Sequence, residues 1–174
     1  MNIDLLHQAY GWTADRIAAA DPAALDAPTP CGLWDLRELF DHAVGVLTII
    51  TEAIDPAASI GAGDWSQRMA VISESRPAWS APGLADKVFE LPFATMPGSV
   101  LAIVGVLESV VHGWDIGQAT GENVEIPDHF AVPVLAFARG AISDDSRGDN
   151  FAADLGLDGS SSDQLVAFLG RKPR

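Results

Sequence analysis

The sequence predicts an all-α protein, a helical bundle with a few additional pieces, on three observations. Apolar residues recur with the 3.6-residue period of an amphipathic helix along most of the chain. Helix start and stop signals separate these periodic segments from one another. The stretch at residues 87–98 (KVFELPFATMPG) is rich in β-branched and aromatic residues, but Pro92 and Pro97 restrict it to a short hairpin or an extended link.

The first two predicted helices flank a proline-rich loop. The first is expected over residues 2–20, where apolar or uncharged side chains share one face. That face consists of Ile3, Leu6, Tyr10, Thr13 and Ile17. The second helix begins at Asp35, which lies three residues before Glu38, the spacing of a capping box, and ends at Pro56.

Four further helices are predicted along the rest of the chain. A less regular one is expected over residues 63–79, and the longest over residues 98–120, closed by Gly121 in the position after its C-cap. Another runs over residues 128–142, and a short terminal helix lies within residues 162–173.

Size and charge bound the class of protein. The 174 residues suit one domain spanning residues 1–174, which can bury roughly 70% of the surface of the unfolded chain. The net charge of −14 repels phosphate, so we expect neither a nucleic-acid partner nor a membrane partner. No segment was expected to reach the ~20 apolar residues of a membrane span. Cys31 is the single cysteine, and the N-terminus lacks signal-peptide features, which favours a reducing, cytoplasmic location.

Two polar residues interrupt the apolar run of the longest predicted helix. Glu108 and His112 are four residues apart, so they project from adjacent turns of one helical face. Burying a carboxylate without a partner costs several kcal/mol. His42 lies at the edge of the apolar stripe of the second helix, so these three side chains converge if the two helices are neighbours.

Two imidazoles and one carboxylate suit a first-row divalent metal, and three protein ligands leave at least one coordination position open. Zinc is the first choice, with nickel, iron or manganese as alternatives. The plainer alternative is a hydrogen-bonded pair of Glu108 and His112, with His42 as a separate half-buried histidine. Asp115 is a candidate for a partner that holds an imidazole N–H, or else a charge on the helix surface.

Four other residues receive structural interpretations. Cys31 has no Lys, Arg or His beside it in the sequence, so we expect a structural role. Trp34 and Trp114 are expected to pack in the core or against a loop, and Asp41 to lie on the surface. No Ser-His-Asp arrangement is evident, so the catalytic residues stay unknown.

Three segments resemble a known family: TPCGLWDLRELFDHAVG, TMPGSVLAIVGVLESVVHGWDIGQATG and DQLVAFLGRKP. This is the actinobacterial metal-binding family related to the N-terminal domain of mycothiol-dependent maleylpyruvate isomerase, within the DinB-like superfamily. The resemblance implies a four-helix bundle core that binds one divalent metal at one end. Residue by residue, it maps the ligands to His42, Glu108 and His112.

The resemblance also implies a function. Members are thought to use the metal to activate a low-molecular-weight thiol such as mycothiol, which then attacks an electrophile, as in an S-transferase or an isomerase-like enzyme. The isomerase has a second domain that this chain lacks, so isomerase activity itself is not expected. Two alternatives stay open: a non-catalytic, metal-dependent small-molecule binding or sensor protein, and a buried polar cluster without metal. A homodimer is a further expectation.

Overall fold

The computed structural model describes residues 1–32, 34–61, 63–147 and 151–173, and it confirms the all-α prediction. The described residues form seven α-helices. They are α1 (Ile3–Ala19), α2 (Leu36–Ile54), α3 (Trp65–Ser73), α4 (Arg76–Trp79), α5 (Gly98–Thr120), α6 (Asp128–Ala141) and α7 (Ser161–Phe168). Two short 3₁₀ turns, η1 (Pro22–Ala24) and η2 (Asp144–Ser146), complete the helical structure of the described residues.

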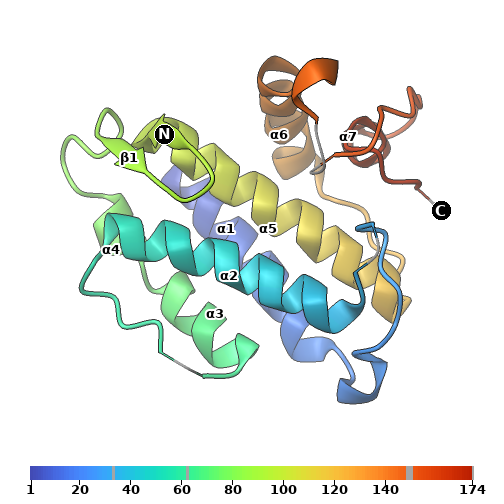
Figure 1. Cartoon of the computed structure of the whole chain (residues 1–174), viewed down its shortest axis with the longest axis horizontal. Coiled ribbons are helices and arrows are strands. Elements are labelled where there is room, and N and C mark those ends of the chain that lie inside the picture. The colour runs from blue at the N-terminus through green and yellow to red at the C-terminus, as the bar shows by residue number, and fades with distance from the viewer. Residues whose placement is uncertain (33, 62, 148–150, 174) are drawn as a thin grey trace.

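The four-helix core consists of α1, α2, α3 and α5, as the family resemblance implied. Helices α1 and α5 run in the same direction, and α2 and α3 run in the opposite direction (Figure 1). Helix α5 packs against both α1 and α2, so it is the central element of the bundle. The polar residues of α5 therefore face helices that can supply partners.

The start of α2 follows from its sequence. The Asp35 side chain accepts a hydrogen bond from the backbone N–H of Glu38, and the Glu38 side chain accepts one from the backbone N–H of Asp35. This reciprocal capping box satisfies two backbone donors at the helix N-terminus. It fixes the first residue of α2, Leu36, and hence the register that places His42 six residues later.

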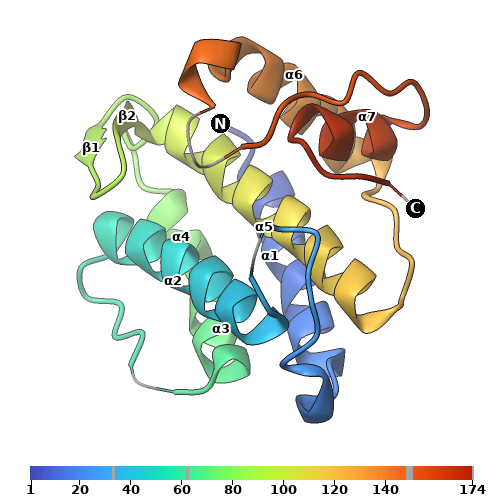
Figure 2. The same ribbon diagram turned by 45° about the vertical axis from the view of Figure 1, so that its right-hand side comes forward.

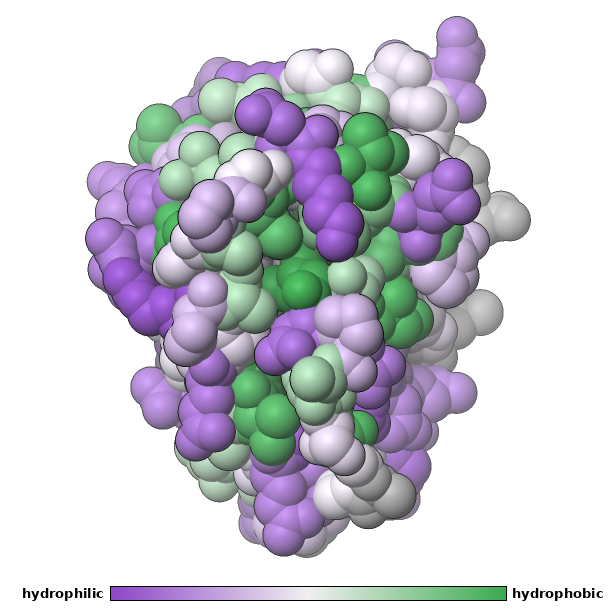
Figure 3. All heavy atoms as spheres, turned by 90° about the vertical axis from the view of Figure 1, so that its left-hand side faces the viewer, coloured by the Kyte–Doolittle hydropathy of each residue, from purple (hydrophilic) through white to green (hydrophobic). Residues whose placement is uncertain are grey.

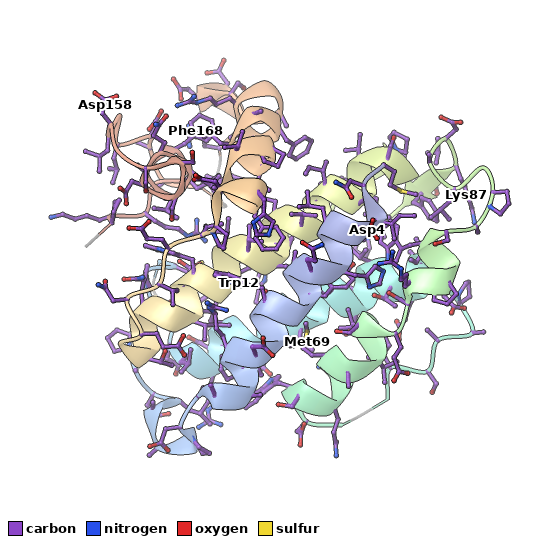
Figure 4. The ribbon with its side chains drawn as sticks, turned by 180° about the vertical axis from the view of Figure 1, so that it is seen from behind. Asp4, Trp12, Met69, Lys87, Asp158 and Phe168 are labelled. Carbon is purple, nitrogen blue, oxygen red and sulfur yellow. The ribbon has the colours of Figure 1, made fainter. Side chains whose placement is uncertain are left out.

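The close approach of α1 and α5 depends on small residues of α5. A Cβ on Gly113 would lie 2.7 Å from Cε3 of Trp12, and one on Gly105 would lie 2.9 Å from Cδ1 of Leu6. Trp12 lies where α1 crosses α5 (Figure 4). Both contacts are shorter than real Cβ contacts, so a larger residue at either position would force the neighbouring side chain to shift, and glycine allows the two helices to approach closely.

The third predicted helix is divided in two. The segment expected over residues 63–79 forms α3 and α4, separated at Glu74 and Ser75. Pro77 explains the break, because it has no N–H to donate to the carbonyl of Ser73, four residues earlier, and is tolerated only in the first turn of a helix such as α4. The hairpin prediction is confirmed: β1 (Val88–Glu90) pairs antiparallel with β2 (Thr95–Pro97). Apolar and polar residues are interspersed on the end of the molecule that carries this hairpin (Figure 3).

Helices α6 and α7 pack against each other and form a layer beside α5 (Figure 2). The C-terminal segment after α7 returns toward the bundle, which brings Arg171 to α5. Helix α5 is long and apolar enough to cross a membrane by length and composition, but 78% of its apolar window is buried inside the protein. It is the core helix of the bundle.

Candidate metal centre

Helices α2 and α5 bring His42, Glu108 and His112 together. One ligand atom from each lies within 4.8 Å of the others. Oε2 of Glu108 is 3.3 Å from Nε2 of His112 and 3.7 Å from Nε2 of His42. The two imidazole rings are nearly perpendicular, at an interplanar angle of 85°. The convergence expected from the helix register is therefore present, while the ligand role of these residues stays a prediction.

The carboxylate of Glu108 is the least satisfied group in this cluster. Its Oε2 is buried and has no hydrogen-bond partner among the described residues, although two imidazole nitrogens lie near it. Burial raises the pKa of Glu108, but His112 and His42 outweigh burial and lower this pKa to about 2. An ionised, unpartnered carboxylate oxygen between two imidazole nitrogens is a donor set that fits a divalent metal.

Asp115 fixes the orientation of the His112 ring. Asp115 is fully buried, and its Oδ2 lies 3.1 Å from Nδ1 of His112. With the Nδ1 proton donated to Asp115, Nε2 points toward Glu108 and His42, and its lone pair becomes available to a metal when the imidazole is neutral. Burial lowers the pKa of His112, but Asp115, Cys31 and Glu108 together raise it well above its usual value. The interpretation of Asp115 as a surface charge is wrong.

Arg171 compensates the buried charge of Asp115. Its Nε donates to Oδ1 and Oδ2 of Asp115 at 2.9 and 3.1 Å, and its Nη2 donates to Oδ2 at 2.9 Å. Burial raises the pKa of Asp115, but Arg171 and His112 more than reverse this and lower it. The charge-assisted, forked geometry makes this pair a rigid support for His112.

Sequence reasoning missed Arg171 because it lies 56 residues from Asp115, after α7. One signal could have pointed to it. A buried aspartate requires a cation, and the chain has ten Lys and Arg residues in all. Arg171 also lies within the C-terminal segment DQLVAFLGRKP, one of the three that carry the family resemblance.

The loop before α2 covers the other side of the cluster. Sγ of half-buried Cys31 accepts a hydrogen bond from Nη2 of Arg171 at 3.4 Å. Cys31 therefore has a cationic neighbour in space, although none lies beside it in the sequence. The ring of Trp34 packs 4.5 Å from that of His42 and 6.5 Å from that of His112, centroid to centroid. Trp34 thus has the expected packing role, and it packs against two candidate ligands.

Cys31, His112 and Asp115 form a second group whose ligand atoms lie within 4.8 Å of one another. This group is less suited to a cation, because the guanidinium of Arg171 already contacts both Asp115 and Cys31. The group of His42, Glu108 and His112 has no such competing cation among the described residues.

Two further predictions concern residues beside the cluster. Trp114 is buried, as expected for a packing residue. Asp41 is exposed at the surface, where it accepts a hydrogen bond from Nε1 of Trp65 at 2.7 Å. Neither residue contributes a donor atom to the metal-ligand groups.

Comparison with known proteins agrees with this architecture. The family model described as "Mycothiol maleylpyruvate isomerase N-terminal domain" matches residues 6–88. Two uncharacterized proteins, from Mycobacterium tuberculosis strains CDC 1551 and H37Rv, are each 32% identical over 158 residues, which covers 86% of this chain and 86% of theirs. The chain belongs to the mycothiol maleylpyruvate isomerase N-terminal domain family.

The family match covers only part of the candidate metal centre. The match over residues 6–88 includes His42 but ends before Glu108 and His112, so the complete cluster rests on the geometry of α2 and α5. The family is mycothiol-related and DinB-like, and the two relatives carry no stated activity. No solved structure matches the chain.

Proposed function

We propose that this protein binds one divalent metal ion through His42, Glu108 and His112 and uses it to activate a small-molecule thiol of the mycothiol type. The thiol would attack a small electrophile, as in an S-transferase or an isomerase-like enzyme. The observation that carries the proposal is the buried Oε2 of Glu108, which faces two imidazoles without a hydrogen-bond partner among the described residues.

The chemistry of the donor set supports a catalytic centre over a structural one. Two imidazoles and one carboxylate leave a coordination position open, whereas structural zinc sites use four protein ligands. A bound divalent metal would lower the pKa of a coordinated thiol, because the thiolate is the softer ligand. Asp115 and Arg171 hold His112, and the partly exposed side chain of His42, at 35%, leaves the site in contact with solvent.

Charge balance also favours an anionic ligand at this site. The carboxylates of Glu108 and Asp115 face the guanidinium of Arg171, which leaves one excess negative charge when the imidazoles are neutral. A divalent ion converts this to one excess positive charge, which a thiolate neutralises. We propose zinc as the first choice of metal, and the cytoplasm as the location because free thiols are maintained there.

The first experiment is elemental analysis of untagged protein. We expect near-stoichiometric metal in the wild type and its loss in the Glu108→Ala/His112→Ala double variant. His129→Ala removes an exposed histidine outside the cluster and should keep the metal. Absence of metal in the wild type, even after incubation with zinc, would contradict the proposal and leave a buried polar cluster.

The second experiment tests turnover. Metal-loaded protein is mixed with mycothiol and with a chromogenic electrophile such as 1-chloro-2,4-dinitrobenzene, and thioether formation is followed by absorbance. We expect product formation that depends on metal, thiol and Glu108. Bound metal without thiol-dependent turnover across a panel of electrophiles would contradict the enzyme and favour the alternative, a metal-dependent binding or sensor protein.

A further inference from the structure

A hollow separate from the candidate metal centre lies at the C-terminal end of α5, between α5, residues 123–125 and the C-terminal segment. Its volume is about 80 Å³, which exceeds the roughly 30 Å³ that one water molecule occupies in the liquid. The residues that define its chemistry are Trp114, Gln118, Val124, Glu125, Asp163 and Pro173. The candidate metal ligands are not among them.

Gln118 contributes a buried acceptor without a partner. The residue is 3% exposed, and its Nε2 donates to the backbone carbonyl of Val124 at 3.1 Å. Because that carbonyl can only accept, the side-chain amide of Gln118 must turn its NH₂ group toward Val124. Its oxygen, Oε1, then points away from that carbonyl. Oε1 has no hydrogen-bond partner among the described residues. Buried polar atoms are almost always paired, so this carbonyl calls for a donor from outside the chain.

The backbone around the hollow holds this arrangement in place. Gly121 and Asn123 have positive φ values of 80° and 52°, which turn the chain sharply after α5. The turn packs the Val124 side chain against Gly117, where a Cβ would lie 2.5 Å from Cγ2 of Val124. The carbonyl of Val124 is thereby fixed opposite Gln118, and the acceptor end of the amide is fixed with it.

The charged lining of the hollow is entirely acidic. Glu125 is exposed, and Asp163 is half-buried, with one oxygen accepting from the backbone N–H of Ser160 at 3.2 Å. The described lining residues include no Lys, Arg or His. Trp114, Val124 and Pro173 supply apolar walls, and an indole ring attracts a cation to its face.

We propose that this hollow binds a small organic cation that carries a primary ammonium group. The ammonium offers three donors to a site whose free groups are the Gln118 carbonyl and two carboxylates. Its alkyl part packs against the apolar walls. The overall charge of −14 raises the local concentration of such a cation. The site goes beyond the thiol chemistry proposed above and does not depend on it.

Nuclear magnetic resonance of the full-length protein tests the proposal with a matched pair of probes. Propylammonium and n-propanol have nearly the same shape, but only the first is charged. The Trp114 indole N–H is assigned by comparison with Trp114→Phe and followed during titration in low salt. We expect a saturable shift with propylammonium and none with n-propanol. Equal shifts with both probes, or no shift with either, would overturn the proposal.

A second matched pair separates a site from general electrostatic attraction. Glu125→Gln removes a carboxylate that lines the hollow, and Glu122→Gln removes an exposed carboxylate of the same link that does not line it. We expect about threefold weaker propylammonium binding for Glu125→Gln, the size of an exposed ion pair, and little change for Glu122→Gln. Equal weakening by both variants would show that the acidic surface, and no defined site, attracts the cation.

Discussion

Two faces of α5 make different kinds of contact with the rest of the protein. The face toward α1 carries Gly105, Ser109 and Gly113, and its contacts are determined by shape. The face toward α2 and the C-terminal segment carries Glu108, His112 and Asp115, and its contacts are determined by charge and hydrogen bonding. The second face presents a buried carboxylate oxygen, Oε2 of Glu108, that has no hydrogen-bond partner among the described residues.

The difference shows where stability and function separate. On the α1 face, Ser109 accepts a 2.7 Å hydrogen bond from Thr13 at its backbone carbonyl, and its hydroxyl donates to the carbonyl of Gly105. On the other face, Oε2 of Glu108 has no hydrogen-bond partner among the described residues at the point where it meets His42 and His112. A helix that packs tightly on one side can thus hold polar groups rigidly on the other.

Removal of Arg171 should have the largest effect on stability. Arg171→Leu leaves Asp115 charged and buried without its cation, which costs about 3–5 kcal/mol of unfolding free energy. Chemical denaturation measures this change. The control Arg139→Leu removes an exposed arginine that makes a long hydrogen bond, 3.5 Å, to Gln164, and should change stability by about 0.5 kcal/mol or less.

The double variant Asp115→Leu/Arg171→Leu separates support of the fold from support of the site. Replacement of a whole buried ion pair by apolar residues is often neutral or stabilising, so we expect most of the lost stability to return. The metal affinity should nevertheless stay about 10–100-fold below wild type, because His112 lacks the acceptor for its Nδ1 proton. Wild-type metal affinity in the double variant would show that the pair does not orient the ring.

Substitution on the face of α5 toward α1 should have a smaller effect on stability, because it disturbs packing and leaves no buried charge without a partner. Gly113→Ala places a Cβ against the Trp12 ring and should destabilise by about 1–3 kcal/mol through overpacking. Gly11→Ala is the matched control, because Gly11 lies inside α1 with nothing within 4 Å of the added carbon. We expect it to stabilise by about 0.4–1 kcal/mol through helix propensity and chain entropy. Equal destabilisation by both would contradict a role for close packing of α1 and α5.

The two faces also differ in how far the sequence predicts them. Spacing along one helix placed Glu108 and His112 together, and the capping box at Asp35 fixed the register of His42. Those are local signals. The contacts of Asp115 with Arg171, and of Trp34 with His42, join segments that no periodicity relates, so periodicity does not predict them.

The same limit applies to the fold. Periodicity and stop signals predicted α1, α2, α5 and α6, because each carries an apolar stripe between clear boundaries. Helix α3 is short, and the break before Pro77 was hidden in an irregular stretch. The packing of α6 with α7 beside α5 is a tertiary feature, and it is this layer that delivers Arg171 to the site.

The pH dependence of stability should distinguish the metal-free site from the loaded one. In metal-free protein, the pKa of Glu108 is lowered from 4.5 to about 2, so its stabilising contribution is complete above pH 4.5 and is lost as the pH falls toward 2. The pKa of His112 is raised above 6.5, so its contribution is complete below pH 6.5 and is lost as the pH rises through the raised value.

Chelated protein should therefore melt at its highest temperature between about pH 4.5 and 6.5 as far as these two groups determine it. A metal must displace the proton from His112, so its stabilising effect should grow with pH and shift the optimum upward. Melting curves with and without chelator should thus diverge as the pH rises above 6.5. Parallel profiles would mean that His112 is not a ligand. The group of His42, Glu108 and His112 would then be a buried polar cluster without metal.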